Sequence, residues 1–523
     1  MHYLGDEIEL KLTVPPSDLA KIWRSRPISR NQIGAKQDVD VVSVYYDTPT
    51  RALRRNGISF RLRRYGQNYL QTVKADTGSL ARRKEWECEV PGGKPDFKVL
   101  SGTVLQPVFK KKKIRQQLQP VFETHVRRGV IVLAWGQSKI EVSLDRGQIK
   151  CGHSRTSISE VELELKEGDP AALFAVANEI AKIAPLRLAA LSKAEAGYRL
   201  ADGERRRSVR STPIVLSRKA TSSEAFREVA NSCLRQVVAN EESVDAAHPE
   251  GVHQMRIGLR RLRTAVAFFS KLTQADPKVE RIKHNLKWIT GQLGPARDID
   301  VYLQKSVKPL ERGRQPVVGS HALKETAERR RKAAFLQARE AIRSKRYRNI
   351  ILDIAEWLNA GAWLTADSVE ARGYQQCPVV DFVRYELRRR RKKLAKKKRN
   401  FEKADAAKRH KIRISAKKLR YANEFFASIF QGRKAKKQRR VFAKSLKQLQ
   451  SSLGDLNDFA LHDRLADRLT LARQTRARGR RGRRRAFAAG TIAGKEHAQV
   501  RPLLKTARRA LGDIADGKQY WRK

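Results

Sequence analysis

The residues best suited to chemistry lie close to the first residue, where Glu7, Glu9 and Lys11 alternate with apolar residues. Because side chains of a β-strand alternate between its two faces, these three share one face. Two such carboxylates can hold a divalent cation, and an ammonium group beside them can hold a phosphate. A strand with a solvated charged face would show the same pattern, so this segment alone leaves both readings open.

The same alternation recurs in later strand-like segments, in which acidic and basic residues take one parity and apolar residues take the other. An antiparallel sheet with one face in water explains the alternation. A closed barrel with its charged face inward also explains why carboxylates and basic residues dominate different strands, because the carboxylates could hold cations and the basic groups phosphates. The residues of the charged parity are Arg61 and Arg63; Thr72 and Lys74; Arg83, Glu85, Glu87 and Glu89; Glu141, Ser143 and Asp145; and Glu160, Glu162 and Glu164.

The elements that must position these residues fall in the first part of the chain. Residues 1–203 are expected to form a mainly β domain, residues 204–219 a linker, and residues 220–515 a domain of long basic amphipathic helices. The helical domain divides into repeats at about 222–360 and 378–515. In the β domain we expect helices near 16–25 and 169–184, and strands near 5–13, 39–47, 57–65, 68–75, 82–91, 119–135, 138–146 and 155–167.

The composition points to a polyanionic partner. The 523 residues are too many for one ordinary core, and their net charge is +58. Residues 1–200 carry +12 of this charge and residues 201–523 carry +46. Nucleic acid, an anionic membrane surface and inorganic polyphosphate are all eligible partners.

The sequence also gives expectations about compartment. Four scattered cysteines without a CxxC pair favour reduced thiols in the cytoplasm over disulfides or zinc. No apolar run approaches the ~18 residues of a membrane span, so we expect no membrane insertion. The sequence enters a charged strand almost at once, which leaves no room for a signal peptide.

The helical part of the sequence contains an internal repeat. A basic segment that begins at His253 returns at His410, and each copy runs on to two consecutive phenylalanines. About forty residues after each histidine comes a Leu-Gly pair followed by acidic residues, at 293–300 and 453–458. Because order, spacing and chemistry agree, we infer a duplication, and two copies favour one pseudo-symmetric bundle over an open solenoid.

Each copy of the repeated helix carries a cationic stripe. Positions 0, 3, 7 and 10 from the histidine fall within about one quarter of a helix circumference, at ~100° per residue, and apolar residues lie opposite. A charge run is usually a solvated face, but the matched spacing favours a binding role. Aromatic residues on which the bases of a single-stranded nucleic acid could stack are sparse around the stripes. The stripes are His253, Arg256, Arg260 and Arg263, and His410, Arg413, Lys417 and Arg420.

The β domain resembles the CYTH family of triphosphate tunnel metalloenzymes, and the resemblance covers nearly the whole domain. It rests on the motif Glu7-x-Glu9-x-Lys11 together with segments spread over the later strands. These segments are Tyr45-Tyr46-Asp47-Thr48, Phe60-Arg61-Leu62-Arg63, Gln71-Thr72-Val73-Lys74, Arg83-Lys84-Glu85-Trp86-Glu87, Leu144-Asp145-Arg146-Gly147, Glu160-Val161-Glu162-Leu163-Glu164-Leu165-Lys166 and Ser192-Lys193-Ala194-Glu195.

The resemblance implies an eight-stranded antiparallel tunnel with flanking helices, and metal-assisted phosphoryl transfer to water with Mg²⁺ or Mn²⁺. The implied catalytic residues are Glu7, Glu9, Lys11 and Lys74. The implied substrate-binding residues are Arg61, Arg63, Lys74, Arg83 and Lys193. The implied metal ligands are Glu7, Glu9, Asp145, Glu162 and Glu164. Two positions depart from the family pattern, since His125 and Ala196 stand where arginine is expected, with Arg127 and Arg199 close by.

The helical part resembles the CHAD family, α-helical domains with characteristic histidines that often follow a CYTH domain, over roughly 222–515. This resemblance implies binding of long-chain inorganic polyphosphate on the basic stripes. The fold class expected for the whole chain is therefore α+β, a β tunnel followed by an all-α duplicated bundle.

Together these observations favour an inorganic triphosphatase that cleaves tripolyphosphate to pyrophosphate and phosphate and also binds polyphosphate. Two alternatives stay open. One is a related enzyme, a thiamine triphosphatase or a class IV adenylate cyclase. The other is a non-enzymatic binder of polyphosphate granules or nucleic acid. The expected location is the cytoplasm, including polyphosphate granules.

Overall fold

A computed structural model describes residues 2–75, 82–100, 103, 105–204, 208–312, 315–365, 368–470 and 479–522. The chain divides into two compact units. The first comprises residues 1–209 together with 343–362, and the second comprises residues 210–342 and 363–523. The segment 343–362, which lies within the first helical repeat of the sequence, thus groups with the β unit.

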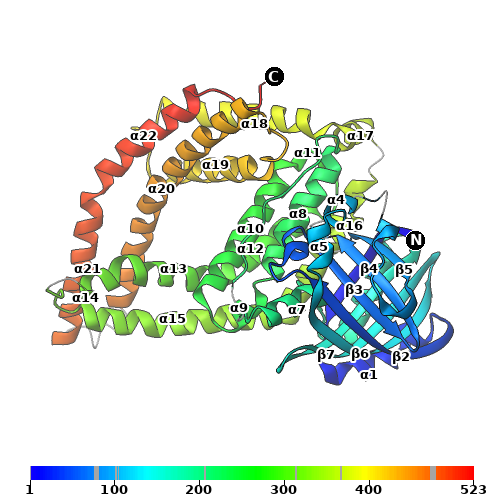
Figure 1. The fold of residues 1–523 in the computed structure, drawn as a ribbon. Helices are drawn as coiled ribbons and strands as arrows, with labels where there is room; N and C mark the ends of the chain where they lie inside the picture. The colour runs from blue at the N-terminus through cyan, green and yellow to red at the C-terminus, as the bar shows by residue number, and fades with distance from the viewer. Residues whose placement is uncertain are drawn as a thin grey trace. The chain divides into compact units, whose positions relative to one another are not determined.

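The first unit is built on one antiparallel sheet that closes on itself (Figure 1). The strand order is β5-β4-β3-β2-β6-β7-β8-β1, and pairing of β1 with β5 completes an eight-stranded barrel, while the two-residue strand β9 pairs with β1 from outside this ring. This confirms the predicted antiparallel tunnel. The strands are β1 (His2–Thr13), β2 (Gln32–Asp47), β3 (Ile58–Tyr65), β4 (Asn68–Ala75), β5 (Arg82–Glu89), β6 (Gln119–Trp135), β7 (Ser138–Cys151), β8 (Ser154–Glu167) and β9 (Arg187–Leu188).

Short helices surround the barrel. Among them α6 packs on β1, β7 and β8, and α16 packs on α6 and β9. Helix α7 and strand β9 were not predicted from the sequence. The helical segments of this unit are η1 (Pro16–Asp18), α1 (Leu19–Trp23), α2 (Arg26–Ser29), α3 (Ala52–Arg55), η2 (Pro91–Gly93), η3 (Lys98–Leu100), α4 (Gln106–Phe109), α5 (Lys112–Gln116), α6 (Ala171–Ile183), α7 (Lys193–Ala201) and α16 (Lys345–Ala360).

The register shows which residues face the barrel interior, because directly paired residues of antiparallel strands point to the same side. Lys11 pairs with Glu162, which pairs with Ser143, and Glu9 pairs with Glu164. On the other side of the barrel, Arg61 pairs with Thr72, which pairs with Glu87. The charged parity seen in the sequence is therefore one continuous inner face.

The inner face changes character along the barrel. At one end it is apolar, where Tyr45, Phe122, Val126, Ile149 and Ile158 pack with Ala194 and Tyr198 of α7. Helix α7 packs against β6, β7 and β8, and a Cβ on its Gly197 would lie 2.0 Å from the Phe122 ring, so this close approach requires glycine. The apolar cluster and α7 thus fill this end of the barrel, and the charged side chains occupy the rest.

Within its described residues, the regular secondary structure of the second unit is helical apart from one isolated β-bridge between Thr221 and Pro378, which confirms the all-α fold expected there (Figure 1, green to red). Its elements are α8 (Ser222–Val238), α9 (Glu241–Asp245), α10 (Pro249–Phe268), α11 (Ser270–Thr273), α12 (Val279–Gln292), α13 (Gly294–Tyr302), the π-helix η4 (Leu303–Val307), α14 (Lys308–Arg312), α15 (Ser320–Arg343), η5 (Ala362–Leu364), α17 (Val369–Gln376), α18 (Val379–Ala395), η6 (Lys396–Lys398), α19 (Ala406–Phe425), α20 (Arg433–Thr470), α21 (Arg480–Ala498) and α22 (Val500–Asp516).

The repeated segments form the helices α10 and α19, which pack against each other. Their paired phenylalanines meet in the core, where the Phe268 and Phe426 rings lie 4.9 Å apart and Phe269 stacks on Phe382 at 5.1 Å. The stripes carried by α10 and α19 are therefore brought together by an aromatic core built from both repeats.

Candidate functional site

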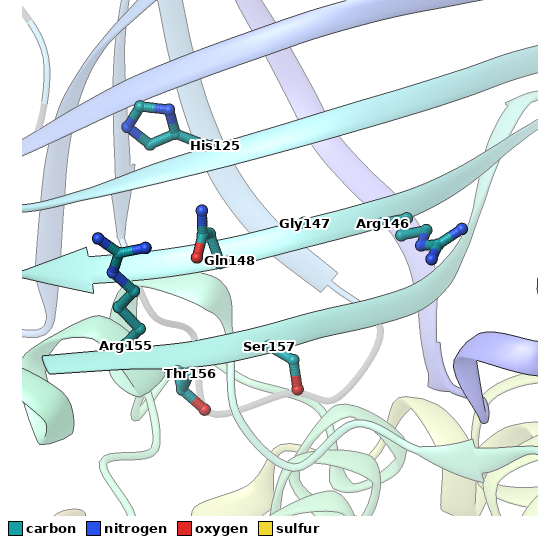
Figure 2. A pocket seen from close by; sticks show the side chains of 7 residues that line it. All are labelled: His125, Arg146, Gly147, Gln148, Arg155, Thr156 and Ser157. Atoms are coloured by element: carbon teal, nitrogen blue, oxygen red, sulfur yellow. The ribbon is translucent and has the colours of Figure 1, made fainter.

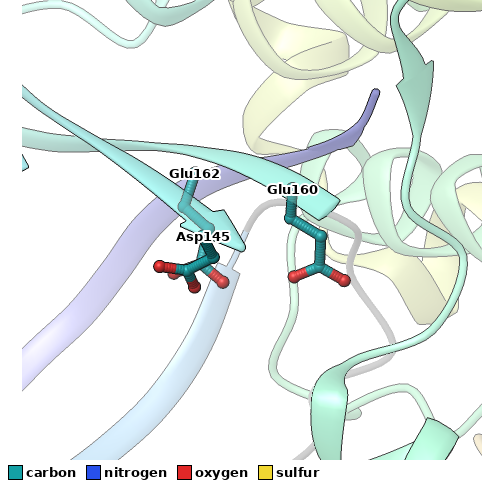
Figure 3. A group of neighbouring side chains, drawn as sticks. All are labelled: Asp145, Glu160 and Glu162. Atoms are coloured by element: carbon teal, nitrogen blue, oxygen red, sulfur yellow. The ribbon is translucent and has the colours of Figure 1, made fainter. Parts of the chain in front are cut away.

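Three carboxylates of neighbouring strands converge in the charged part of the barrel (Figure 3). Asp145 of β7 and Glu160 and Glu162 of β8 each offer an oxygen, and these oxygens lie within 4.8 Å of one another. Asp145 is fully buried and Glu162 is 8% exposed. Three closely spaced carboxylates are the ligands that a hard divalent cation prefers, so the donor set fits such an ion.

Three cationic groups neutralise this trio. Lys193 places its Nζ 2.7 Å from Asp145, 2.6 Å from Glu160 and 2.8 Å from Glu162. Lys11 donates to Glu162 at 2.7 Å. Arg128 of β6 donates to both oxygens of Asp145, at 2.7 and 2.6 Å, and to Glu162 at 2.7 Å. The three carboxylates of the trio are thus balanced by three cations.

The pKa shifts follow from this balance. Burial disfavours the ionised form of Glu162, but Lys11, Lys193 and Arg128 outweigh it and hold its pKa well below the usual value. Burial likewise opposes ionisation of Asp145, yet Lys193 and Arg128 lower its pKa. Burial also disfavours the Lys193 ammonium, but the three carboxylates raise its pKa well above the usual value. Glu162, Asp145 and Lys193 are therefore ionised at neutral pH.

A short motif places Lys193. The Ser192 side chain accepts a hydrogen bond from the Glu195 backbone N–H at 3.1 Å, and the Glu195 carboxylate accepts one from the Ser192 N–H at 3.0 Å. This capping box begins α7 and puts Lys193 at its first position. The ammonium therefore reaches the carboxylates from a helix that also fills the apolar end of the barrel.

A second charged group lies on β3, β4 and β5. Lys74 contacts Glu85 at 2.7 Å, and Arg61 lies 3.8 Å from both Glu85 and Glu87. The Thr72 hydroxyl donates to Glu87 at 2.7 Å. Burial and then Arg61 are the main influences on Glu87, and the cations prevail, so its pKa lies below the usual value. This wall presents guanidinium and ammonium groups from the side opposite to the carboxylate trio.

The stripes of the second unit converge in one cationic cluster. Burial lowers the pKa of Lys417 to about 7, and the charges that act on it most strongly belong to Arg260, Arg413, Arg420 and Arg256. These groups come from both α10 and α19. Burial also lowers the pKa of Arg256 to about 10. Here cations face cations, and the arrangement suits a ligand that brings many negative charges.

The two halves of the cluster, one from each repeat, are pseudo-symmetric. Gly294 lies beside Arg256, and Gly454 lies beside Arg413, in corresponding positions. Arg256 is 3.8 Å from Asp298, and the negative charge that acts most strongly on Arg413 is that of Asp458. The Leu-Gly segments therefore lie beside the stripes in both repeats.

The two repeats differ in the surroundings of their histidines. His410 is exposed and its Nδ1 lies 2.8 Å from the Asn457 side-chain oxygen. His253 is half-buried, and burial with the nearby Arg297 lowers its pKa to about 4. Arg297 occupies the position in the first repeat that Asn457 occupies in the second. Arg263 is exposed at the end of its stripe, next to Lys418.

Comparison with known proteins gives both units a family. Residues 5–198 match the CYTH domain family, and residues 228–467 match the CHAD domain family. The chain combines a CYTH domain with a CHAD domain.

Two similar proteins fit this assignment. An inorganic triphosphatase from Haemophilus influenzae is 29% identical over 203 residues, which are 37% of this chain and 54% of that protein. The chain thus spans about half the length of this relative. A crystal structure of the CHAD domain from the plant Ricinus communis has 28% sequence identity and a TM-score of 0.50, and it covers 60% of this chain and 99% of that one.

The CYTH domain brings most of the predicted residues to its interior. Glu9 is 3% exposed and lies 3.2 Å from Lys11. Glu164 accepts a hydrogen bond from Lys166 at 2.7 Å and stands apart from the carboxylate trio. Arg63 donates to the Tyr65 hydroxyl at 2.7 Å. The side chains of Glu7 and Arg83 lie outside what the structure describes, although their backbones pair between β1 and β5.

Two interior residues were missed in the sequence. Glu160 was placed at the charged parity but not among the metal ligands. Arg128 follows Arg127 directly, so nothing local tells which of the two faces inward. The signal that finds Arg128 is its pairing with Asp145 across β6 and β7.

The structure differs from the sequence expectation at His125 and Ala196. His125 pairs with Gln148 on the outer face of the sheet and lies 2.7 Å from Glu123, in a groove also lined by Arg146, Arg155, Thr156 and Ser157 (Figure 2). Arg127 is exposed and 3.6 Å from Asp38, so it cannot compensate inside the barrel. Ala196 packs beside the apolar cluster. The interior arginine of β6 is Arg128.

Within the described residues, no helix is both long and apolar enough to cross a membrane.

Proposed function

We propose that the CYTH domain hydrolyses inorganic triphosphate to pyrophosphate and phosphate with Mg²⁺ or Mn²⁺, and that the CHAD domain binds long-chain polyphosphate. The observation that carries the first proposal is the interior in which the trio Asp145, Glu160 and Glu162 faces a wall of Lys and Arg. A linear phosphate chain with a cation matches both halves of such an interior.

The trio would hold the cation together with Glu7 and Glu9, and Glu164 is a further candidate ligand. Bound there, the ion would polarise a phosphate oxygen and lower the pKa of a bound water. Lys11, Arg128 and Lys193 would then turn from the carboxylates to the oxygens of the phosphate chain. From the opposite wall, Arg61, Arg63, Lys74 and Arg83 would stabilise the charge that grows on the leaving phosphate.

The charge balance also predicts how binding of the cation affects binding of the triphosphate. Without ligands, the trio and its three cationic partners satisfy one another. A cation alone must displace Lys193 and Arg128, and a triphosphate alone must draw those same groups from their carboxylates. When both ligands enter, each releases the groups that the other needs. Binding of cation and triphosphate should therefore be cooperative.

The test is a substrate panel with the full chain. Phosphate release from tripolyphosphate, thiamine triphosphate and ATP is measured with Mg²⁺ and with Mn²⁺, alongside formation of cyclic AMP. We expect the highest kcat/KM on tripolyphosphate. Faster turnover of thiamine triphosphate or formation of cyclic AMP would replace our proposal with one of the related activities. Inactivity with every substrate and both metals would leave polyphosphate binding as the remaining proposed role.

The polyphosphate proposal rests on the convergence of the two stripes in one cluster of Arg256, Arg260, Arg413, Lys417 and Arg420. A polymer without bases gains mainly from dense positive charge and counterion release. Competition between long-chain polyphosphate and RNA at physiological ionic strength tests it, and stronger binding of RNA would refute it. We further propose a cytoplasmic location at polyphosphate granules, which a fluorescent fusion can check.

A further inference from the structure

The first half of α20 carries a stripe of basic side chains that belongs neither to the barrel nor to the cluster on α10 and α19. From its first residue the members follow at steps of four, three, four and three residues, so at ~100° per residue they lie within about a quarter of the helix circumference. All of them are exposed, and the stripe runs for about 21 Å at ~1.5 Å per residue. The members of this α20 stripe are Arg433, Lys437, Arg440, Lys444 and Lys447.

The charge of the α20 stripe is not neutralised by the protein. Within the part of the chain that the structure describes, none of its five side chains forms an ion pair or a hydrogen bond. No acidic residue occurs between Glu424 and Asp455. A solvated helix face usually mixes charges of both signs or pairs them within one turn, as Arg420 and Glu424 do on α19. Five neighbouring cations without a counter-charge instead suit an anionic ligand.

Core packing fixes the direction in which the stripe faces. On the opposite face of α20, Phe442, Leu446 and Leu449 are buried, and the Phe442 ring lies 5.3 Å from the Trp521 ring. Because this apolar face is buried in the bundle, α20 cannot offer it to a membrane. Among the described residues of the stripe and its flanks, Val441 is the exposed large apolar side chain, and no aromatic ring is exposed on which a base could stack. The stripe therefore recognises charge alone.

The α20 stripe begins where the CHAD cluster ends. Arg420, the last member of the cluster along α19, donates to the Gln450 side chain of α20 at 2.7 Å, and Gly454 lies beside Arg413. At ~100° per residue, Gln450 and Gly454 lie about 100° and about 60° from the centre of the stripe, between it and the buried face. A phosphate chain that leaves the cluster past Arg420 would therefore meet Lys447 next. The CHAD cluster consists of Arg256, Arg260, Arg413, Lys417 and Arg420.

The first repeat has no counterpart of this stripe. Counted back from the Leu-Gly pair of each repeat, the last three stripe positions correspond to Glu280, His284 and Lys287 of α12, and the first two correspond to positions before α12 begins. Glu280 also forms an ion pair with Lys283 at 2.7 Å. Both repeats thus contribute to the cluster, but only the second sequence extends it with a row of cations.

We propose that a long phosphate chain held in the CHAD cluster continues along the α20 stripe, so that the domain binds long chains more tightly than chains that fill the cluster alone. This proposal rests on the polyphosphate binding proposed above and adds the length of ligand that the domain selects. Once one part of the chain is held, the next part meets the stripe at a high effective concentration. Each further contact between a cation and a phosphate releases counterions and strengthens binding.

The test titrates the full chain with size-fractionated polyphosphates, from tetrapolyphosphate to long chains, without divalent cation so that none is hydrolysed. The stripe variant combines Lys437→Gln, Arg440→Gln and Lys444→Gln, and glutamine is a good helix former. Its affinity for the longest chains should fall by about 10-fold or more, and its slope of log affinity against log salt should fall by about two. Its affinity for tetrapolyphosphate should change by less than about twofold, because so short a chain does not span cluster and stripe.

A matched variant removes the same charge from another helix. Arg483, Arg484 and Lys495 are exposed on α21, which packs on the other end of α20. Replacing all three by glutamine should leave the dependence of affinity on chain length unchanged. Circular dichroism of both variants confirms that a lost signal does not come from unfolding.

The outcomes separate this inference from the function on which it rests. Equal losses for short and long chains, equal losses in both variants, or an unchanged affinity of the stripe variant for long chains overturn the inference and leave binding at the cluster intact. Absence of binding of polyphosphate of every length by the unaltered protein overturns the proposed CHAD function itself. Tighter binding of duplex DNA than of long polyphosphate at equal salt, lost in the stripe variant, would assign the stripe to nucleic acid and overturn our choice of ligand.

Discussion

Lys193 of the CYTH domain is buried and Lys417 of the CHAD domain is half-buried, and the surroundings of these two lysines act in opposite directions. Burial penalises both ammonium groups. Three carboxylates within 2.8 Å overcome that penalty at Lys193 and raise its pKa, whereas four arginines add to it at Lys417 and lower its pKa to about 7. The pKa of the same kind of side chain is thus raised in one domain and lowered in the other.

The difference shows what each site requires of its ligand. The barrel interior carries its own counter-charges, so a ligand must bring charges of both signs, a cation with an anionic chain, to satisfy both sets of groups. The CHAD cluster carries an excess of one sign, so an anion alone completes it. One arrangement favours selective chemistry on a small composite ligand, and the other favours adhesion to a long polymer.

The largest expected effect follows from removing one carboxylate of the trio in the barrel. Glu162→Gln leaves Lys11, Lys193 and Arg128 without the carboxylate that they share, and takes one oxygen from the cation site. We expect tripolyphosphatase kcat to fall by about 10²–10³-fold, as for loss of a preorganised charge contact. Glu167→Gln, at the exposed end of the same strand, is the control and should retain activity. Full activity of Glu162→Gln would show that the trio has no part in the reaction.

The next test removes a cation that neutralises the trio. Lys193→Met deletes the internal cation that competes for the trio, so Mn²⁺ alone should bind about 10-fold more tightly while triphosphate turnover is lost. Electron paramagnetic resonance of Mn²⁺ measures this binding directly, without catalysis. In the wild type, a non-hydrolysable triphosphate should strengthen Mn²⁺ binding, and in Lys193→Met this coupling should shrink. Weaker Mn²⁺ binding by the variant would contradict internal competition.

A third test separates the two domains. Arg260→Glu should weaken binding of long-chain polyphosphate about 10-fold at moderate salt, and reduce the slope of log affinity against log salt by about one or more. Hydrolysis of tripolyphosphate should stay within about twofold, because the cluster is not part of the barrel. Arg501→Glu, on the exposed face of α22, makes the same charge change elsewhere and should leave affinity nearly unaltered. Equal effects of both variants would mean that net charge alone attracts the polymer.

The smallest expected effect concerns His125. Because this side chain faces outward, His125→Arg should change tripolyphosphatase kcat/KM by less than about twofold. Arg128→Gln, three residues along the same strand, should instead reduce it strongly. Higher activity in His125→Arg would restore the view that this position belongs to the phosphate site.

Alternation along the strands predicted one charged face on each strand, and the resemblance to the CYTH family was needed to choose a closed barrel over an open sheet. In the charged half, residues such as Glu9, Lys11, Arg61 and Glu162 differ so sharply from their neighbours that parity assigns their face unambiguously. The repeated spacing from His253 and His410 likewise predicted that two matched helices would share a core. These are local patterns, and they survive folding because a strand or helix imposes one geometry on its whole length.

The features that the sequence did not predict depend on contacts between distant segments. Arg127 and Arg128 are equivalent in the sequence, and only pairing with Asp145 distinguishes them. The inner face turns from charged to apolar between Arg128 and Val126, so polarity no longer marks the inside at the other end, where His125 faces out. The convergence of Arg256, Arg260 and Lys417 required the packing of α10 on α19, which spacing within one helix does not give.

The apolar end of the barrel affects how a phosphate chain could enter the interior. Tyr45, Phe122, Val126, Ile149 and Ile158 fill the interior beneath α7, so this end of the barrel is closed by apolar side chains. A phosphate polymer would therefore not pass through the barrel from end to end. If phosphate chains are the substrate, cleavage is terminal, each round begins at a chain end, and the products must leave the way the substrate came.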